Sequence, residues 1–231
     1  MSQTDQQAAY VLHGRPYRDT SLLVDFFTLE YGKIPAVVQG ARRPKSKLRA
    51  SVQPFVPVQI GWRGRNELKT ITQAEPVAAM MFLNGDALLC GLYVNELLSR
   101  TLQPFDPHPP LYVYYQYVLN ELVSGKDIEG ALRTFEHRLL DELGYLPELG
   151  NQQDEQIYLL DPEHGFSILS SRDISDKRKP FCFYGWQLNA ISDDNYENPQ
   201  VRRASKRLMR ALIDRVLGYK PLRSRELFQK M

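Results

Sequence analysis

The sequence has few cysteines and no long apolar run. Its 231 residues include two cysteines, Cys90 and Cys182, and neither has a second cysteine or a histidine at metal-ligand spacing. No apolar stretch approaches the roughly 20 residues that a membrane-spanning helix needs. The polar N-terminus lacks the apolar stretch of a signal peptide. We therefore expect a protein of the cytosol without a disulfide, a zinc site or a membrane span.

Catalytic signatures are also missing. The chain has no P-loop, dinucleotide glycine fingerprint, nucleophile elbow or zincin helix. Adjacent carboxylates occur at Asp141-Glu142 and at Asp193-Asp194. The first pair would diverge by about 100° on a helix, and the second is typical of a polar turn. We expect a binding protein, not an enzyme, with no cofactor and no metal. A metal-dependent nuclease is the less favoured alternative.

Acidic residues are absent between Glu30 and Glu67. Residues 31–66 therefore sum to +8, residues 201–231 also sum to +8, and the whole chain is only +2. Charge concentrated in this way indicates contact with a polyanion, whereas a merely solvated surface is the alternative. The cations of the first block are Lys33, Arg42, Arg43, Lys45, Lys47, Arg49, Arg63 and Arg65.

The first 80 residues read as short strands separated by turn residues. Five strands in so short a segment predict a small barrel, and the OB-fold is the five-stranded barrel known for binding nucleic acid. The basic run 42–49 would form the loop between the third and fourth strands, because its proline and serine discourage strand structure. The expected strands are 9–13, 21–28, 33–38, 55–62 and 68–74.

Helical periodicity begins after Pro76. We expect an α+β protein with an OB-fold domain at 1–78 and a mainly helical domain at 79–231. Residues 150–184 are irregular, and 157–168 resemble a hairpin. The expected helices are 86–102, 111–123, 128–143, 186–191 and 201–217.

The predicted contacts are with phosphate groups. The barrel cations would follow a nucleic-acid backbone without reading its sequence. On the helix 201–217, Arg203, Arg207 and Arg210 share one face and could form a second basic surface. Trp62 could stack on a base, but a hydrophobic plug is preferred. The tyrosines of 111–123 are more often a core face than a stacking ladder.

Several segments, in order along the chain, resemble the bacterial DNA repair protein RecO family of recombination mediators. The residues that carry the resemblance are 9–16 with 20–22, 40–43, 53–57, 91–100, 132–136 through 143–145, and 220–228. The resemblance implies an N-terminal OB-fold followed by a helical domain with a zinc-finger-like insert. Many members carry four cysteines in this insert, and this chain keeps only Cys182 there, so we expect a degenerate, metal-free insert at about 150–184.

The resemblance also implies function and partners. Such proteins bind single- and double-stranded DNA, anneal complementary strands and engage the acidic tail of single-stranded-DNA-binding protein. With RecR they help load the RecA recombinase onto coated strands, which implies a cytoplasmic protein associated with the nucleoid. An RNA- or ribosome-binding barrel is the alternative, and it should prefer structured RNA and fail to anneal DNA.

The family's tail-binding pocket lies in the helical domain and uses an arginine. Arg133 is the candidate for the terminal carboxylate of the tail, with Leu132, Phe135 and Leu139 as apolar surface beside it. A surface arginine paired with Asp127 or Glu129 is the alternative.

Overall fold

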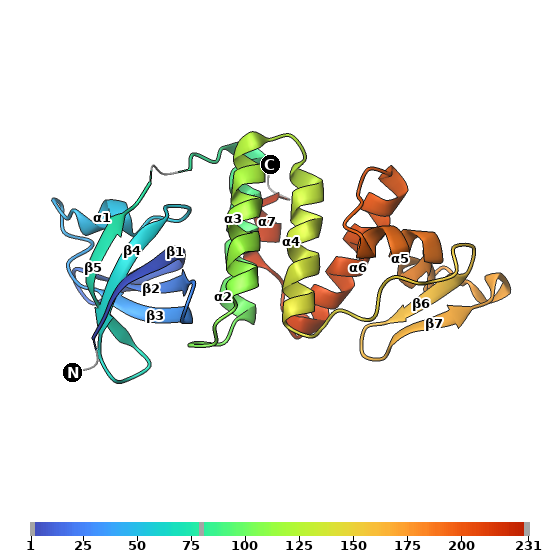
Figure 1. Ribbon diagram of the computed structural model, residues 1–231, viewed down its shortest axis with the longest axis horizontal. Coiled ribbons are helices and arrows are strands. Elements are labelled where there is room, and N and C mark those ends of the chain that lie inside the picture. The colour runs from blue at the N-terminus through green and yellow to red at the C-terminus, as the bar shows by residue number, and fades with distance from the viewer. Residues whose placement is uncertain (1–2, 79–80, 229–231) are drawn as a thin grey trace. The chain divides into compact units, whose positions relative to one another are not determined.

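The computed structural model describes residues 3–78 and 81–228 (Figure 1). The chain forms two compact units, Met1–Lys126 with Leu222–Met231, and Asp127–Pro221. In the described part, no helix is both long enough and apolar enough to cross a membrane. The division at residue 78 between an OB-fold domain and a helical domain stays a prediction.

A closed barrel in the first unit has the strand order β1-β2-β3-β5-β4. Neighbouring strands are antiparallel except β3 and β5, which pair in parallel at Ala36 with Lys69 and at Val37 with Thr70. The closed five-stranded barrel confirms the predicted OB-fold. The strands are β1 (Gln3–Tyr17), β2 (Ser21–Thr28), β3 (Gly32–Val38), β4 (Val58–Arg63) and β5 (Lys69–Pro76).

Side chains alternate between the barrel interior and its outer surface. On β3, Ile34, Ala36 and Val38 are fully buried, and the residues between them are only partly buried. Trp62 at the end of β4 is 4% exposed and meets Tyr31 edge-on, with 5.2 Å between ring centroids. The indole is therefore the expected hydrophobic plug and is not available to stack on a base.

Helices α2 (Gly85–Thr101), α3 (Pro109–Ser124) and α7 (Arg223–Phe228) complete the first unit. The buried Asn95 on α2 links this helix to the barrel, since its amide donates to the carbonyls of Val11 (3.3 Å) and Leu12 (3.1 Å). Its side-chain oxygen accepts from the Tyr115 hydroxyl at 2.8 Å.

The tyrosines of α3 divide between the core and the surface. Tyr112 and Tyr115 are buried, and both rings lie within 6 Å of the ring of Tyr10 on β1. Tyr117 is 39% exposed. The expected aromatic core face is therefore confirmed for the two buried rings.

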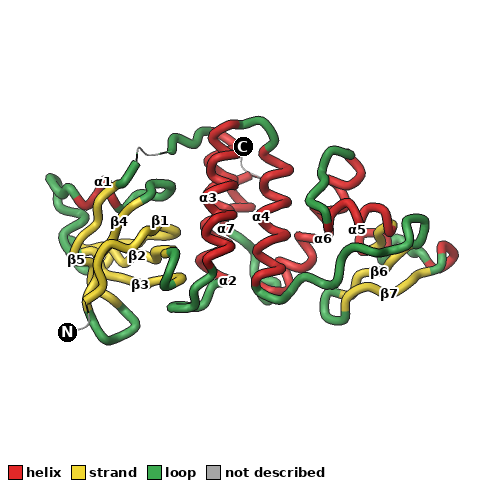
Figure 2. The backbone as a smooth tube through the Cα atoms, viewed as in Figure 1, coloured by secondary structure: helices red, strands yellow, loops and turns green. Residues whose placement is uncertain are grey.

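The second unit combines α4 (Ile128–Glu142), α5 (Gly185–Ser192) and α6 (Pro199–Val216) with a three-stranded sheet (Figure 2). The sheet has the order β7-β6-β8, with β6 (Ile157–Asp161), β7 (Gly165–Leu169) and β8 (Cys182–Tyr184). Strands β6 and β7 confirm the expected hairpin. Two short 3-10 turns, η1 (Ser171–Asp173) and η2 (Lys179–Phe181), lie between β7 and β8. Helix α4 ends as expected, because Gly144 adopts the left-handed conformation with φ of 71°.

Candidate nucleic-acid interface

The predicted basic loop connects β3 to β4 and carries five exposed cations. Successive turns order its backbone, with Arg43 N–H donating to Gly40 O and Ser46 N–H donating to Arg43 O, both at 3.1 Å. A short helix, α1 (Leu48–Ser51), follows. In the described part of the chain, no ion pair to a carboxylate engages these five side chains. Their charge is therefore available to a ligand. The five residues, called the basic loop here, are Arg42, Arg43, Lys45, Lys47 and Arg49.

The start of the basic loop is fixed to the turn between β1 and β2. The backbone N–H of Arg42 donates to Thr20 O at 2.9 Å, and its guanidinium donates to the carbonyls of Arg18 (3.3 Å) and Asp19 (3.4 Å). The preceding residue, Ala41, is fully buried in the barrel core. Arg42 thus anchors the loop while its side chain stays exposed.

Apolar residues anchor the other end of the loop. Val52 and Val56 belong to the buried core of the barrel, and Leu48 packs against it. The segment is therefore amphipathic, because its apolar side chains cover the barrel interior and its cations project into solvent. This burial holds the charges on the barrel surface without using them in internal ion pairs.

Arg63 is the last residue of β4, and Arg65 follows it in the next loop. Although both follow the basic loop in sequence, strand pairing brings Arg63 near the start of that loop. Thr70 of β5 pairs with Val37 on one side and with Arg63 on the other. Two ladder steps of about 4.8 Å therefore separate Val37 from Arg63. Both arginines are exposed, and Arg65 lies in the loop between β4 and β5. In OB-folds this loop flanks the ligand-binding face.

Lys33 is the one cation of this fully described block that is not exposed, and it has a structural partner. Its ammonium group is half-buried and donates to the carbonyl of Ser99 on α2 at 2.7 Å. Burial lowers the pKa of Lys33, although the nearby Asp25 carboxylate acts in the opposite direction. Lys33 therefore joins the barrel to α2, a role that the sequence did not indicate.

The cations of α6 differ in how far they are available. Arg203 and Arg210 are exposed, and Arg210 is 3.8 Å from Asp214. Arg207 donates to three backbone carbonyls and is only partly exposed. Arg202, for which the sequence predicted no role, forms a bidentate pair with Asp127 at 2.5 and 2.6 Å. That hydrogen-bonded pair lowers the pKa of the Asp127 carboxyl and raises the pKa of Arg202.

The predicted tail-binding residues of α4 lie in the interior of the second unit. Phe135 and Leu139 are at most 1% exposed, so they do not form the expected apolar surface. Arg133 and Leu132 are each 8% exposed. The alternative, a surface arginine paired with Asp127 or Glu129, is not what the structure shows, because the Arg133 guanidinium lies 2.8 Å from the buried carboxylate of Glu136. The Nε atom of Arg133 is buried and has no hydrogen-bond partner among the described residues.

One member of the carboxylate pair at 193–194, Asp194, has a structural role. Asp194 accepts from the imidazole of His137 at 2.7 Å, from the guanidinium of Arg138 and from the Tyr196 hydroxyl at 3.1 Å. Burial acts to raise the pKa of Asp194, but the His137 and Arg138 partners outweigh it and lower the pKa. No cluster of three potential metal-ligating side chains occurs among the described residues. This geometry gives the nuclease alternative no support.

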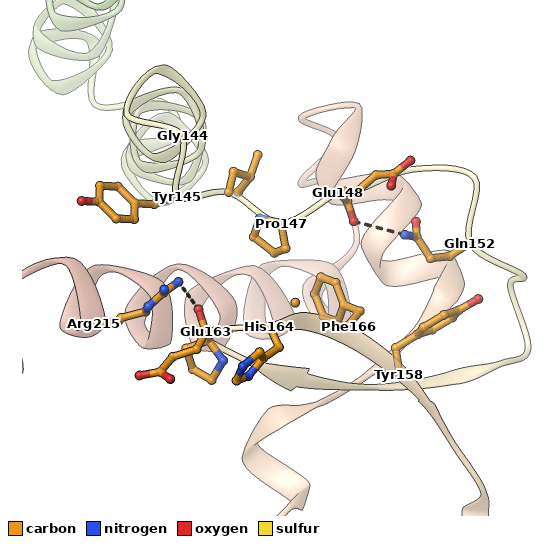
Figure 3. Close-up of a pocket in the computed structure, with 13 residues that line it drawn as sticks. Gly144, Tyr145, Pro147, Glu148, Gln152, Tyr158, Glu163, His164, Phe166 and Arg215 are labelled. Carbon is orange, nitrogen blue, oxygen red and sulfur yellow. Dashed lines mark hydrogen bonds between the residues drawn. The ribbon is translucent and has the colours of Figure 1, made fainter.

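A pocket of about 460 Å³ in the second unit lies between the β6–β7 hairpin and the segment after α4 (Figure 3). Arg215 reaches from α6 to the hairpin turn and donates to the carbonyl of Pro162. Two exposed carboxylates, Glu148 and Glu163, also line the pocket, and they would repel an acidic peptide. None of the predicted site residues lines it.

Comparison with known proteins gives matches along the chain. Residues 1–80 match the family model described as "Recombination protein O N terminal", and residues 83–153 match "Recombination protein O C terminal". The chain is 43% identical over 230 residues to DNA repair protein RecO of Pseudomonas putida (strain GB-1), with all of both chains covered. It is 43% identical to the RecO protein of Pseudomonas aeruginosa (strain LESB58), covering 99% of this chain and 96% of that protein.

A relative from another genus gives a similar result. The RecO protein of Burkholderia pseudomallei (strain 1710b) is 40% identical over 228 residues, covering 96% of this chain and 82% of that protein. Identity at this level over nearly the full length, together with both family models, settles the relationship. The chain belongs to the DNA repair protein RecO family.

Proposed function

We propose that this RecO-family chain is a recombination mediator that binds single- and double-stranded DNA, anneals complementary strands and helps load recombinase onto coated strands. The observation that carries the proposal is the acid-free basic loop, whose five exposed cations are anchored on an OB-fold barrel. Arg63 and Arg65 extend the positive surface along the barrel.

The barrel would bind DNA by its phosphates. Each cation that neutralises a phosphate releases a condensed counterion, so binding is favoured by entropy and weakens with salt. Because lysine and arginine contacts to phosphate carry no base information, we expect little sequence preference. A mediator needs this property, since it has to act wherever a single strand is exposed.

Partner binding is the second part of the proposal. The partners are the acidic tail of single-stranded-DNA-binding protein, RecR, and indirectly the RecA recombinase. Arg133 is the proposed receptor for the tail carboxylate, and its unpartnered Nε supports this role. Because Glu136 already lies 2.8 Å from the guanidinium, the tail would have to compete with it.

The partner proposal has a direct test. We expect Arg133→Gln combined with Glu136→Gln to weaken binding of a synthetic tail peptide, because this double variant removes the receptor without leaving a lone buried charge. The single change Glu136→Gln is the matched control and should strengthen binding by freeing Arg133. Unchanged affinity in the double variant would refute the assignment of Arg133.

The experiment that tests the whole function is annealing of two complementary oligonucleotides without nucleotide or metal. One series uses naked strands, and the other uses strands coated with single-stranded-DNA-binding protein. Faster annealing on coated strands is the expected result. Binding without faster annealing on either substrate, together with preference for structured RNA, would refute the mediator function in favour of an RNA-binding barrel.

A further inference from the structure

We propose that the second unit carries its own phosphate-binding surface, formed by α6 together with the segment before β8, and that this surface holds a second DNA strand. The inference rests on the proposed function, because it assumes that the basic loop holds the first strand. The surface, called the insert patch here, consists of Lys177, Arg178, Lys179, Arg203, Lys206 and Arg210, all of them exposed.

Arg207 joins the two parts of the insert patch. Its guanidinium donates to the carbonyls of Lys179 (2.9 Å), Pro180 (3.3 Å) and Cys182 (3.2 Å). The same group lies over the ring of Phe183, 4.8 Å from the ring centroid. One side chain of α6 thus fixes the backbone of η2 and of the start of β8. The segment that a family member with four cysteines would organise with metal is organised here by a guanidinium.

Helix geometry then places the cations of α6 beside that segment. Arg203 precedes Arg207 by four residues and Arg210 follows it by three, so all three lie on one face of α6. Lys206 is adjacent on the neighbouring face. Because Arg207 contacts the backbone of Lys179 directly, the exposed side chains of 177–179 lie next to those of α6.

Within the insert patch, cations outnumber the carboxylates near them. Asp173 and Asp176 lie on the segment before β8, and Asp214 is 3.8 Å from Arg210 on α6. Six exposed cations against three carboxylates leave a net positive surface. The patch cations are solvated rather than set around an apolar groove, which fits a flexible polyanion better than a folded partner.

The separation of the two surfaces has a chemical consequence. The basic loop belongs to the first unit and the insert patch to the second. Two complementary strands repel each other until their phosphates are neutralised, and one protein with two phosphate-binding surfaces can neutralise both. The insert patch therefore holds the second strand during annealing. Arg207 positions the patch and does not itself contact phosphate.

Strand bridging tests the inference. Two non-complementary oligonucleotides, one with a donor dye and one with an acceptor dye, are mixed with the full chain, and energy transfer reports that one protein holds both. The patch variant is Lys177→Ala/Lys206→Ala/Arg210→Ala, and the control variant is Lys126→Ala/Lys220→Ala/Arg223→Ala, which removes the same charge elsewhere. Three lost phosphate contacts should weaken capture of the second strand by about 50-fold at 0.15 M salt.

The outcomes separate this inference from the proposed function. We expect the patch variant to bind a single strand within twofold of the wild type but to lose bridging and annealing, while the control variant keeps all three. Normal bridging and annealing in the patch variant would overturn the inference and leave the function of the basic loop intact. If removal of basic-loop charges also left single-strand binding unchanged, the proposed function itself would fail.

The role of Arg207 has a separate readout. Arg207→Lys keeps the charge but replaces the planar guanidinium, whose two terminal nitrogens reach the three carbonyls, with a single ammonium nitrogen. We expect this variant to lose bridging and to be cleaved faster by trypsin within 177–179, because that backbone is held less firmly, whereas Arg203→Lys changes neither. If Arg207→Lys bridges normally, Arg207 does not position the patch.

Discussion

Removing charge from the basic loop should change the salt dependence of DNA binding by a defined amount. The change is Lys45→Ala/Lys47→Ala/Arg49→Ala. All three side chains are exposed, and among the residues that the structure describes none of them belongs to an ion pair or to the packed core. The variant should therefore fold normally, and any loss of affinity should reflect lost phosphate contacts.

The expected magnitude follows from counterion release. Each contact to a single strand contributes about 0.7 to the slope of log affinity against log salt, so three lost contacts should reduce the slope by about 2. This change in slope also predicts that the affinity of the variant is lower than that of the wild type by about 50-fold at 0.15 M salt and by about 500-fold at 0.05 M. The loss should thus be larger at low salt, which distinguishes lost phosphate contacts from a change in packing.

Fluorescence anisotropy of a labelled oligonucleotide, titrated at several salt concentrations, gives both quantities. The control variant Lys126→Ala/Lys220→Ala/Arg223→Ala carries the same change in net charge, and its slope should stay near that of the wild type. If both variants lost the same slope, net charge rather than the basic loop would control binding. An unchanged slope in the loop variant would refute the phosphate contacts altogether.

Three further predictions concern stability. Asn95→Ala should cost about 2–4 kcal/mol in urea unfolding, because it removes two buried hydrogen bonds to the carbonyls of Val11 and Leu12 and the acceptor of the Tyr115 hydroxyl, and Tyr115→Phe should cost less. Asp194→Asn should cost about 2–4 kcal/mol by the same assay, since it leaves His137 and Arg138 without their carboxylate; a cost below 1 kcal/mol would contradict the network. Burial acts to raise the pKa of Glu96, but hydrogen bonds from Ser224, Arg223 and Arg100 outweigh it and lower the pKa. The Glu96 carboxylate therefore stabilises the fold above its ordinary pKa, and this contribution is lost as pH falls through the lowered folded-state value. The melting temperature of Glu96→Gln should thus change less than that of the wild type between pH 7 and pH 3, because the contribution is lost only below the ordinary carboxyl pKa.

Much of the fold could be predicted because its elements have strong local patterns. Strand β3 alternates and α6 has a clear apolar stripe, so both periods are visible in the sequence. Strand β8 has only three residues and forms through pairing with β6, so no local pattern could indicate it. Helix α7 is also short, and Glu96 of α2 accepts from its first backbone N–H groups, a contact that is distant in sequence.

The candidate site was harder to predict, because the hydrogen-bond partners of an arginine or lysine, and not its residue type, decide whether its charge is available to a ligand. Helical spacing correctly placed Arg207 with Arg203 and Arg210 on one face, but it could not show the three carbonyls that engage Arg207. The sequence of α4 did contain a signal that its predicted tail-binding residues are buried. Leu132, Phe135 and Leu139 follow the i, i+3, i+7 spacing of a buried face, which argues for a core and against a binding surface.

The two basic blocks have equal net charge but different available charge. In the first block the basic loop, Arg63 and Arg65 are all exposed, and Lys33 has a structural partner. In the second block Arg202 is paired with Asp127, Arg207 and Arg215 donate to backbone carbonyls, and Arg225 lies over the ring of Tyr93.

The difference arises from composition. A stretch without acids cannot neutralise itself, whereas α6 carries Asp214 and packs against acidic neighbours. We therefore expect the barrel to hold one strand tightly and the insert patch to hold the other weakly. This order suits annealing, because a weakly held second strand can be exchanged until it finds its complement. If the insert patch bound a single strand as tightly as the barrel does at 0.15 M salt, this ranking of the two surfaces would be wrong.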